Sequence, residues 1–310
     1  MTTPRSPLRQ VRVKVPATTA NLGSGFDIFG LALQLYNTYT LTLTCEPEWS
    51  VSLPPGIDLP SDADNLVFHA VRQVFQRLGA VPPSLHLDQE IDIPLSRGLG
   101  SSASAIIGGL VAANRLTGST LDHATLLAMA TEIEGHPDNV TPALMGGMTL
   151  CYATSAQYCY LALPIPQNVQ IVVAIPDFEL NTSQARSVLP NQVSRSDVIF
   201  NGSRTALLVA ALYQKRYDLL AEAMDDRLHQ PYRAALVPGM TEAIAAGYAA
   251  NALGVALSGS GPSLIALTQN ETSAVAAALS GAFARHDIAC ETRILQPDTT
   301  GAEDVETRCE

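Results

Sequence analysis

The order of strands and helices in the second half of this chain fits few folds. The expected elements are a strand at 169–175, helical segments to about residue 250, strands at 255–257 and 263–267 around a glycine-rich turn, a helix at 272–285 and a strand at 288–295. Strand, helices, strand, strand, helix and strand is the split βαβ order of a ferredoxin-like domain. The sequence therefore predicts that fold for the second half.

The first half contains both kinds of hydrophobic period. Val11, Val13 and Val15 alternate with basic residues, which indicates a half-buried strand. The further elements expected here are strands at 39–43 and 85–88, helices at 65–78, 101–116 and 121–134, and a hairpin over 146–152 and 158–163. Gly135 and Pro137 are expected to stop the third of these helices.

Two prolines mark the expected domain boundary. A length of 310 residues favours two domains, and Pro164 and Pro166 interrupt the pattern between the two halves. We expect an α+β protein with domains at 1–165 and 166–296 and a polar, acidic, disordered tail at 297–310. Apolar residues make up 47% of the chain and are spread throughout, so a sizeable core can form.

Composition excludes several function classes. The net charge is −11 and no basic stripe is visible, which argues against nucleic-acid binding. No apolar run approaches the roughly 20 residues that span a bilayer. The basic segment 1–14 is not followed by the apolar stretch of a secretory signal, so a cytoplasmic location is expected. The five cysteines lack zinc-site spacing, which argues against a structural metal or a disulfide framework.

A glycine- and serine-rich segment, P-L-S-R-G-L-G-S-S-A-S at 94–104, precedes an expected helix. Glycines let a backbone approach a ligand closely, and a helix N-terminus attracts anions, so the segment can cradle a phosphate. A glycine turn with serine as the helix N-cap is an equally good interpretation of the segment by itself. No G-x-x-x-x-G-K-[ST] loop is present, and no second strand with an acidic end follows as a dinucleotide site requires.

Three other segments are richer in polar and glycine residues than ordinary connections. They are P-A-T-T-A-N-L-G-S-G-F-D at 16–27, E-G-H-P-D-N at 134–139 and G-V-A-L-S-G-S-G-P-S at 254–263. Each also has a plain structural interpretation. The first can be a turn whose Asn21 and Asp27 satisfy local backbone groups. The second can be a helix C-cap made by Gly135 and His136, and the third a hairpin turn.

In combination and order, the three glycine motifs resemble those of the GHMP kinases. The resemblance spans nearly the whole chain, from Val15 to Ala266. Within that superfamily, E-G-H-P-D-N-V at 134–140, N-T-S-Q-A-R-S-V-L-P at 181–190 and H-Q-P-Y-R at 229–233 are similar to the motifs of homoserine kinases. In this chain His136 follows Gly135 directly, whereas many homoserine kinases carry extra residues between the Glu-Gly pair and the histidine. The resemblance therefore implies a tighter loop here.

This resemblance implies a fold, a reaction and ligands. The N-terminal domain should be like ribosomal protein S5 domain 2, followed by the ferredoxin-like domain. The co-substrate should be ATP with Mg²⁺, and the substrate the side-chain hydroxyl of L-homoserine. The product would be O-phospho-L-homoserine, a precursor of threonine. The resemblance also suggests a homodimer.

Homoserine is a zwitterion, so its site needs both charges. Arg186 and Arg233 can bind the carboxylate, each with the alternative of a structural ion pair, and Asp27 can bind the ammonium. The candidate neutral hydrogen-bonding residues are Asn21, His136, Asn139 and Thr182. We expect Asn139 to orient the hydroxyl without a strong general base, and Asp138 to point elsewhere. His136 can equally be a structural histidine.

The remaining candidates concern the nucleotide and the metal. Glu134 and Ser102 can complete the Mg²⁺ shell and are counted as catalytic with Asn139. The candidate nucleotide-binding residues are Pro94, Leu95, Ser96, Arg97, Gly98, Leu99, Gly100, Ser101, Ser102, Ala103, Ser104, Gly259, Ser260 and Gly261. The resemblance implies that adenine lies near Asn65. The alternative interpretation is that Asn65 only caps the helix that follows it. The alternatives are a mevalonate or diphosphocytidyl-methylerythritol kinase, whose substrates have no ammonium–carboxylate pair, and a non-catalytic nucleotide-binding protein.

Overall fold

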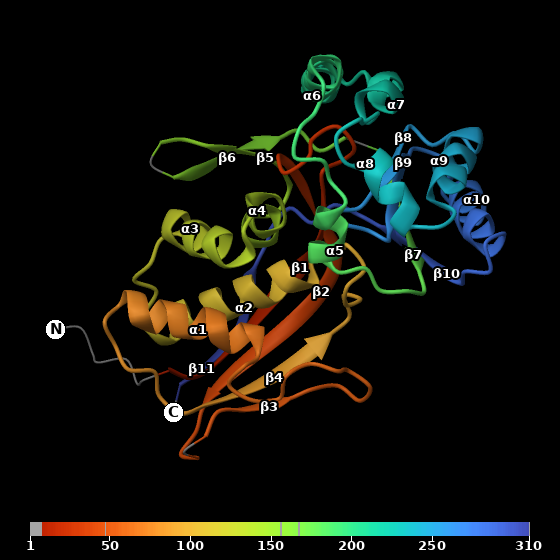
Figure 1. Cartoon of the computed structure of the whole chain (residues 1–310). Coiled ribbons are helices and arrows are strands. Elements are labelled where there is room, and N and C mark those ends of the chain that lie inside the picture. Colours follow the sequence, from red (N-terminus) through yellow and green to blue (C-terminus); the bar gives the residue numbers. More distant parts are fainter. Residues whose placement is uncertain (1–7, 47, 156, 167, 310) are drawn as a thin grey trace.

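The computed structural model describes residues 8–46, 48–155, 157–166 and 168–309, so residues 1–7 of the basic N-terminal segment and Glu310 lie outside it. Within the described residues the chain forms two β-sheets, one of seven strands and one of four, with helices packed against both (Figure 1). None of the described helices combines the length and apolar character that crossing a bilayer requires.

The first sheet has the strand order β11-β1-β2-β4-β3, and β5 extends it by pairing with β2 and β6. Its strands are β1 (Leu8–Ala20), β2 (Phe29–Leu43), β3 (Ser50–Ser52), β4 (Leu85–Ile91), β5 (Met148–Ala153), β6 (Tyr158–Leu163) and β11 (Glu303–Cys309). Val11, Val13 and Val15 are fully buried on one face of β1, as their alternation predicts. The expected hairpin is the antiparallel pair β5–β6.

Four helices lie over one face of this sheet (Figure 1): α1 (Leu66–Arg77), α2 (Ser101–Leu116), α3 (His123–Glu134) and α4 (Pro137–Met145). Three of them match the expected helices, and α4 was not expected. Pro137 stops α3 as predicted, but it also starts α4 as its first residue, where its missing N–H costs no hydrogen bond. The chain therefore turns at Gly135 and His136 and begins a new helix at once.

The second sheet has the order β10-β7-β9-β8, with every neighbouring pair antiparallel. Its strands are β7 (Gln170–Pro176), β8 (Gly254–Leu257), β9 (Leu264–Thr268) and β10 (Cys290–Leu295). Helices α9 (Met240–Ala249) and α10 (Thr272–Ala284) share an apolar core with one of its faces. This topology confirms the ferredoxin-like prediction.

One long helix and several short ones follow β7 and precede α9. They are α5 (Thr182–Ser187), α6 (Arg195–Gln214), η1 (Tyr217–Leu219), α7 (Leu220–Ala223), α8 (Gln230–Arg233) and η2 (Ala234–Leu236). Helices α6 and α7 join an apolar cluster that also includes residues of both sheets, such as Leu31 and Ile171. This shared core fixes the two sheets against each other. The boundary expected at 165/166 falls in the connection from β6 to β7 and stays a prediction.

The prediction of a disordered tail at 297–310 was wrong for the described residues. Asp298 donates its N–H to the carbonyl of Ala32 (2.9 Å), and β11 then pairs antiparallel with β1. The sequence pattern does not reveal strand β11, because this segment is acidic and has no apolar alternation. Its charges meet the basic face of β1, where the Lys14 Nζ lies 3.6 Å from a Glu303 carboxylate oxygen. A segment that follows the second sheet in sequence thus completes the first.

Candidate active site

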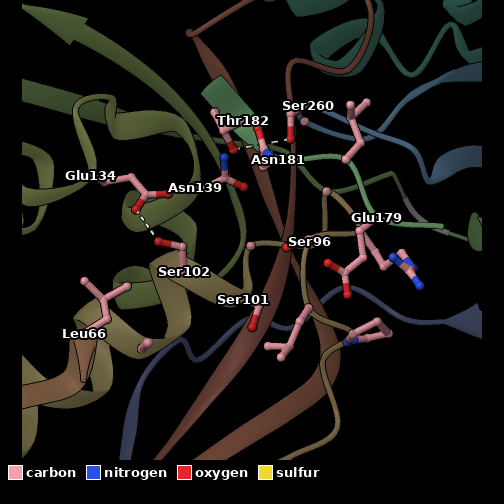
Figure 2. A pocket seen from close by; sticks show the side chains of 18 of the residues that line it. Leu66, Ser96, Ser101, Ser102, Glu134, Asn139, Glu179, Asn181, Thr182 and Ser260 are labelled. Atoms are coloured by element: carbon pink, nitrogen blue, oxygen red, sulfur yellow. Dashed lines mark hydrogen bonds between the residues drawn. The ribbon is translucent and has the colours of Figure 1, made fainter. Parts of the chain in front are cut away.

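A cavity of about 700 Å³ brings the candidate motifs together. Its lining comes from segments 21–27, 37–39, 56–66, 89–105, 134–139 and 179–186 and from Arg233, Gly259 and Ser260. Figure 2 shows Ser102 between two regions of this cavity, one near Leu66 and the other near Thr182 and Ser260. The walls therefore come from both halves of the chain, with the start of helix α2 between them.

The start of α2 has the features of an anion cradle. Its N-cap is Gly100, which has no side chain to cap the helix, so the interpretation of a serine N-cap is wrong. The first intrahelical bond runs from the N–H of Ser104 to the carbonyl of Gly100. The N–H groups of the first turn, including Ser101 and Ser102, thus have no carbonyl partner within the helix. Both serines line the cavity, so this turn can bind phosphate oxygens.

Gly98 and Gly100 were expected to let the backbone approach a ligand closely, but the structure gives them another role. Gly98 and Gly100 have φ of +73° and +71°, which side-chain-bearing residues seldom adopt. A Cβ on Gly98 would collide with the backbone of Ser258, and one on Gly100 with the hydroxyl of Thr18. These glycines therefore let the loop pack against the protein's own chain, and the loop shape that results presents α2 to the cavity.

Ser102 and Glu134 meet at the side of the cradle (Figure 2). The Ser102 hydroxyl donates to a carboxylate oxygen of Glu134 over 2.8 Å. Burial raises the pKa of Glu134, although the bond from Ser102 and the charge of His136 act in the opposite direction. A carboxylate oxygen next to a hydroxyl oxygen is the donor set that Mg²⁺ takes from proteins when phosphate and water supply its other ligands. The pair therefore fits the metal role expected of it.

Asp27 and Arg186, predicted to bind opposite ends of the substrate, pair with each other. The guanidinium donates to both carboxylate oxygens, over 2.6 and 3.1 Å. Burial lowers the pKa of Arg186, but the hydrogen bond and charge of Asp27 outweigh this and raise it overall. About a third of each side chain is exposed, so a charged ligand can reach both.

His136, Asp138 and Asn139 lie together at the start of α4. The His136 Nδ1 is 2.6 Å from Asp138 Oδ1, and the Thr18 hydroxyl donates to the Asn139 carbonyl oxygen over 2.8 Å. Asp138 borders the cavity, so the expectation that it points elsewhere was wrong. Burial lowers the pKa of His136, but its bond to Asp138 raises it overall. Ligand atoms of Asp27, His136 and Asp138 lie within 4.8 Å of one another, close enough to bind one cation.

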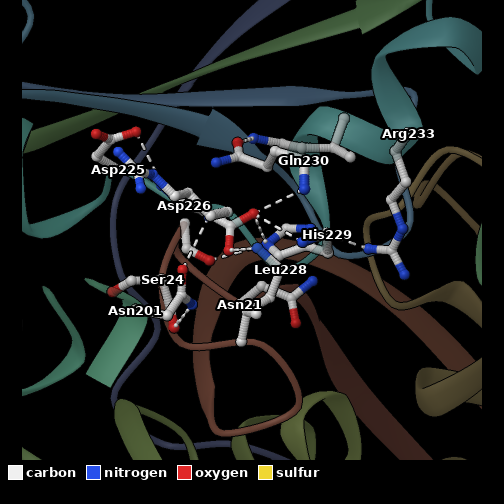
Figure 3. A network of polar contacts seen from close by, with 12 residues as sticks. Asn21, Ser24, Asn201, Asp225, Asp226, Leu228, His229, Gln230 and Arg233 are labelled. Atoms are coloured by element: carbon white, nitrogen blue, oxygen red, sulfur yellow. Dashed lines mark hydrogen bonds and ion pairs between the residues drawn. The ribbon is translucent and has the colours of Figure 1, made fainter. Parts of the chain in front are cut away.

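Arg233 is 1% exposed and is held by the backbone and a histidine (Figure 3). It donates to the carbonyls of Ala185 (3.1 Å) and Gly259 (3.0 Å) and to His229 Nδ1 (3.2 Å). Burial, followed by the charge of Arg186, lowers the pKa of Arg233 to about 10, so it remains cationic near neutrality. It lines the cavity as a fixed positive charge.

The histidine that holds Arg233 is itself fixed. His229 lies 2.8 Å from the carbonyl of Gly23 through Nε2, so Nε2 carries the proton and Nδ1 accepts from Arg233. Asp226 accepts the backbone N–H groups of Leu228, His229 and Gln230 and thereby fixes the start of α8 (Figure 3). Burial lowers the pKa of His229, which favours the neutral ring that this arrangement requires.

Most of the other predicted residues also line the cavity. Asn21 donates to the carbonyl of Gly259 (2.9 Å) and accepts the N–H of Asp27 (3.0 Å), while Thr182 lies 3.5 Å from Ser260. Asn65 caps α1, because its side chain accepts from Val67. Pro94, Leu95, Ser96 and Arg97 also border the cavity.

Four candidates from the nucleotide motifs lie elsewhere. Leu99 and Ala103 are buried in apolar clusters, Ser104 bonds to Tyr39, and Gly261 contacts Leu257. The motif therefore alternates between residues that face the cavity and residues that anchor the loop.

Sequence reasoning also missed residues that shape the site. The ring of Phe26 stacks on His229 with 5.2 Å between ring centroids, and the guanidinium carbons of Arg186 and Arg233 lie 5.5 and 5.2 Å from it. An aromatic residue within the otherwise small and polar segment 16–27 was the available signal. No periodicity could have placed this ring between two arginines.

Comparisons with known proteins cover both halves of the chain. The model for the GHMP kinases N terminal domain matches residues 65–147, and the model for the GHMP kinases C terminal matches residues 208–284. The homoserine kinase of Trichormus variabilis is 44% identical over 301 residues, with 96% of this chain and 99% of that protein covered. The homoserine kinase of Carboxydothermus hydrogenoformans is also 44% identical, with coverages of 95% and 97%.

Solved structures agree with these matches. The crystal structure of homoserine kinase from Cytophaga hutchinsonii superimposes with a TM-score of 0.87 at 28% identity and covers 98% of each chain. Mevalonate kinase of Methanococcus jannaschii gives a TM-score of 0.69 at 14% identity, covering 93% of this chain and 98% of that one. The second likeness concerns the fold alone.

Proposed function

Because this chain belongs to the homoserine kinase family of the GHMP kinases, we propose that it transfers the γ-phosphoryl group of ATP to the side-chain hydroxyl of L-homoserine. The product is O-phospho-L-homoserine, an intermediate of threonine biosynthesis. The observation that carries the proposal is the presence, in one cavity, of a phosphate cradle and of both charges that an amino acid requires. A cytoplasmic location and a homodimer remain predictions.

The amino-acid end of the cavity has the charges of a zwitterion site. Arg186 and Arg233 bind the carboxylate, and Asp27 binds the ammonium, with Asp138 adding negative charge nearby. Asp27 and Arg186 neutralise each other in their ion pair. Homoserine supplies a carboxylate for the arginine and an ammonium for the aspartate, so the ion pair exchanges partners without leaving a charge unpaired.

The nucleotide end begins at the cradle. The phosphates lie on the first turn of α2, where N–H groups and the helix dipole favour negative charge. Ser102 and Glu134 are the residues that hold Mg²⁺, and their two oxygens fit its preference for hard ligands. When bound, the metal supplies positive charge beside the transferring phosphoryl group.

The chemical step depends on position more than on a base. Thr18 donates to the carbonyl oxygen of Asn139, and Asn139 Nδ2 lies 3.5 Å from Asp138 Oδ1, which leaves its second amide hydrogen to bond the homoserine hydroxyl oxygen and aim it at the γ-phosphate. An amide does not titrate near neutrality, and the carboxylates of Asp27 and Asp138 are already engaged by Arg186 and His136. The hydroxyl proton leaves late, with phosphate oxygens as its nearest acceptors in a loose transition state.

The alternatives from the same superfamily fit less well. Mevalonate and diphosphocytidyl-methylerythritol have no ammonium group, which would leave Asp27, His136 and Asp138 without a cationic ligand. A non-catalytic nucleotide-binding protein would have no use for the Ser102–Glu134 pair.

A substrate panel tests the proposal. The protein is incubated with MgATP and L-homoserine, L-serine, L-threonine, mevalonate or homoserine methyl ester, and ADP release is measured. We expect turnover with L-homoserine well above the rest, a phosphorylated product in mass spectrometry, and loss of activity with EDTA that added Mg²⁺ restores. Faster turnover of mevalonate, or equal use of the ester and the free acid, would overturn the assignment.

A further inference from the structure

A glutamine interrupts an apolar row on strand β4. Leu85 and Leu87 point to the same side of the sheet and are fully buried, and Gln89 occupies the same face with 6% of its surface exposed. Its cross-strand neighbour is Tyr39, which belongs to the core beneath α1 and α2. The strand pattern would favour another leucine here, so the amide needs an explanation.

The side-chain Nε2 of Gln89 has no hydrogen-bond partner among the described residues. This nitrogen is also buried. Neighbouring polar groups at this end are paired: the Tyr39 hydroxyl lies 3.1 Å from both Asn37 Nδ2 and Ser104 Oγ. Burying a polar group without a partner is unfavourable, so a position that keeps one commonly serves a ligand.

Gln89 borders the active-site cavity at the end suited to a nucleotide base. The apolar residues that line the cavity include Ile57, Leu59, Pro60, Leu66, Ile91 and Pro94. Figure 2 shows Leu66 on the far side of Ser102 from Thr182 and Ser260. Since phosphates lie on the first turn of α2 and the amino acid takes the end with Arg186, the base of the nucleotide extends toward Leu66. Apolar walls accept its flat faces, and a polar group is needed to read its edge.

The residue that the family resemblance places near adenine is already engaged. Asn65 accepts the N–H of Val67 over 3.0 Å, and its Nδ2 donates to the carbonyl of Pro60 over 2.8 Å. Both ends of that amide are thus used to start α1 and hold the preceding loop. Gln89, with an unpaired amide on the same cavity, is the better candidate to contact the base.

We propose that Gln89 determines nucleotide specificity by hydrogen-bonding the edge of the adenine base, an inference that rests on the proposed use of ATP. A carboxamide offers one donor and one acceptor side by side, which complements the amino group and neighbouring ring nitrogen of adenine. A half-turn about the terminal bond of the side chain exchanges the two ends, so either order is accessible without moving the strand. At the edge formed by position 6 and N7, a base with a carbonyl at position 6 presents two acceptors, so neither orientation of the amide can make both hydrogen bonds.

The test compares ATP with ITP, which carries a carbonyl at position 6, in direct binding measured by calorimetry without homoserine. Gln89→Met keeps the shape and removes the hydrogen bonds. We expect wild-type protein to prefer ATP, and the variant to bind ATP about tenfold more weakly while ITP affinity changes little. In turnover assays the ATP KM should rise, and the homoserine KM should change less. Gln10→Met, on β1 with its amide bonded to Thr42, is the matched control and should leave the ATP preference intact.

The outcomes separate this inference from the proposed function. Unchanged ATP affinity and an unchanged ATP-to-ITP ratio in a folded Gln89→Met protein would overturn the inference and assign the amide to structure. Gln89→Leu gives the same test if the methionine variant folds poorly, because it continues the apolar row. Failure to phosphorylate homoserine would sink the proposed reaction but leave the binding comparison valid, since that comparison needs no turnover.

Discussion

Arg186 donates two hydrogen bonds, of 2.6 and 3.1 Å, to the carboxylate of Asp27 and so links helix α5 to the loop that follows β1. The two residues are 159 positions apart in the chain. Each carries the charge that one end of an amino acid would otherwise supply. Under the proposed function, substrate binding would replace this ion pair by two others, one at each end of the amino acid.

Arg186→Lys should raise the homoserine KM by roughly 10- to 100-fold, because an ammonium cannot reproduce two parallel hydrogen bonds to a carboxylate. ATP KM should change little, and initial rates at varied homoserine and varied ATP measure both. Arg233→Lys is the informative comparison: Arg233 is buried and bonded to two carbonyls, so that variant should also lose thermal stability. A selective rise in ATP KM for Arg186→Lys would instead place this arginine with the phosphates.

Ser101→Asp should abolish most ATP binding without harming the fold. An acidic residue in the first turn of α2 is favourable for the helix but repels phosphates, so ATP affinity should fall by at least about tenfold while the melting temperature holds. A substitution at Gly100 would be a poorer test, since a side chain there would collide with Thr18 and damage the loop. Ser101→Ala is the neutral control. Tight ATP binding by Ser101→Asp would mean that the phosphates lie elsewhere.

Glu134→Gln should lower kcat by about 100-fold with a smaller effect on homoserine KM, because a neutral amide is a weaker Mg²⁺ ligand and charge compensation matters most in the transition state. The Mg²⁺ concentration giving half-maximal rate should rise as well. Steady-state rates over a Mg²⁺ titration measure both quantities. If kcat at saturating Mg²⁺ is unchanged, Glu134 serves mainly to hold Ser102 through their 2.8 Å bond.

Asn139→Leu should reduce kcat by roughly 10- to 1000-fold through lost orientation of the hydroxyl. The shape of the kcat–pH profile should not change, because no titrating base is removed. Thr18→Val, which removes the hydroxyl bonded to Asn139, should give a smaller loss of the same kind. An acidic limb in kcat that disappears in Asp138→Asn or His136→Gln, with homoserine binding intact, would show that one of these residues acts as a base.

Protein stability should fall at mildly acidic pH partly because of His229. Burial lowers the pKa of this histidine in the folded state, so the unfolded chain binds a proton more readily. Its contribution is complete above the unfolded pKa of about 6.5 and is lost as the pH falls through the folded pKa. In urea unfolding at several pH values, His229→Gln should lose less stability than wild type between about pH 6.5 and 5. His123→Gln, on the surface, is the control; equal pH slopes for His229→Gln and wild type would contradict the prediction.

The predictable parts of the fold were those in which one face of an element is apolar. The ferredoxin-like order and helices α1, α2 and α3 follow from such periodicity. Helix α4 and strand β11 do not: α4 begins at a proline and contains Pro142, and β11 is an acidic strand whose partners are charges on β1. Both gain their stability from neighbours that the local sequence does not reveal.

Within the site, motifs predicted which residues line the cavity but not how they pair. The contact of Asp27 with Arg186 and the support of Arg233 by His229 depend on approach between distant segments. The need for glycine at position 100 likewise comes from the closeness of Thr18, and no sequence pattern connects these two residues. Gln89 was visible in the sequence as a polar residue in an apolar alternation, but its meaning required the cavity beside it.

The pairing of β11 with β1 has a consequence for synthesis on the ribosome. Strand β11 follows the whole second sheet in sequence. Every residue of the second sheet is therefore synthesised before β11 can pair with β1 and complete the edge of the first sheet. Until then β1 presents an unpaired edge, which is a point where strands of other chains can add. The elements from β7 to β10 are thus inserted in the topology of the first sheet, and β1 depends for its edge on a strand that is synthesised after them.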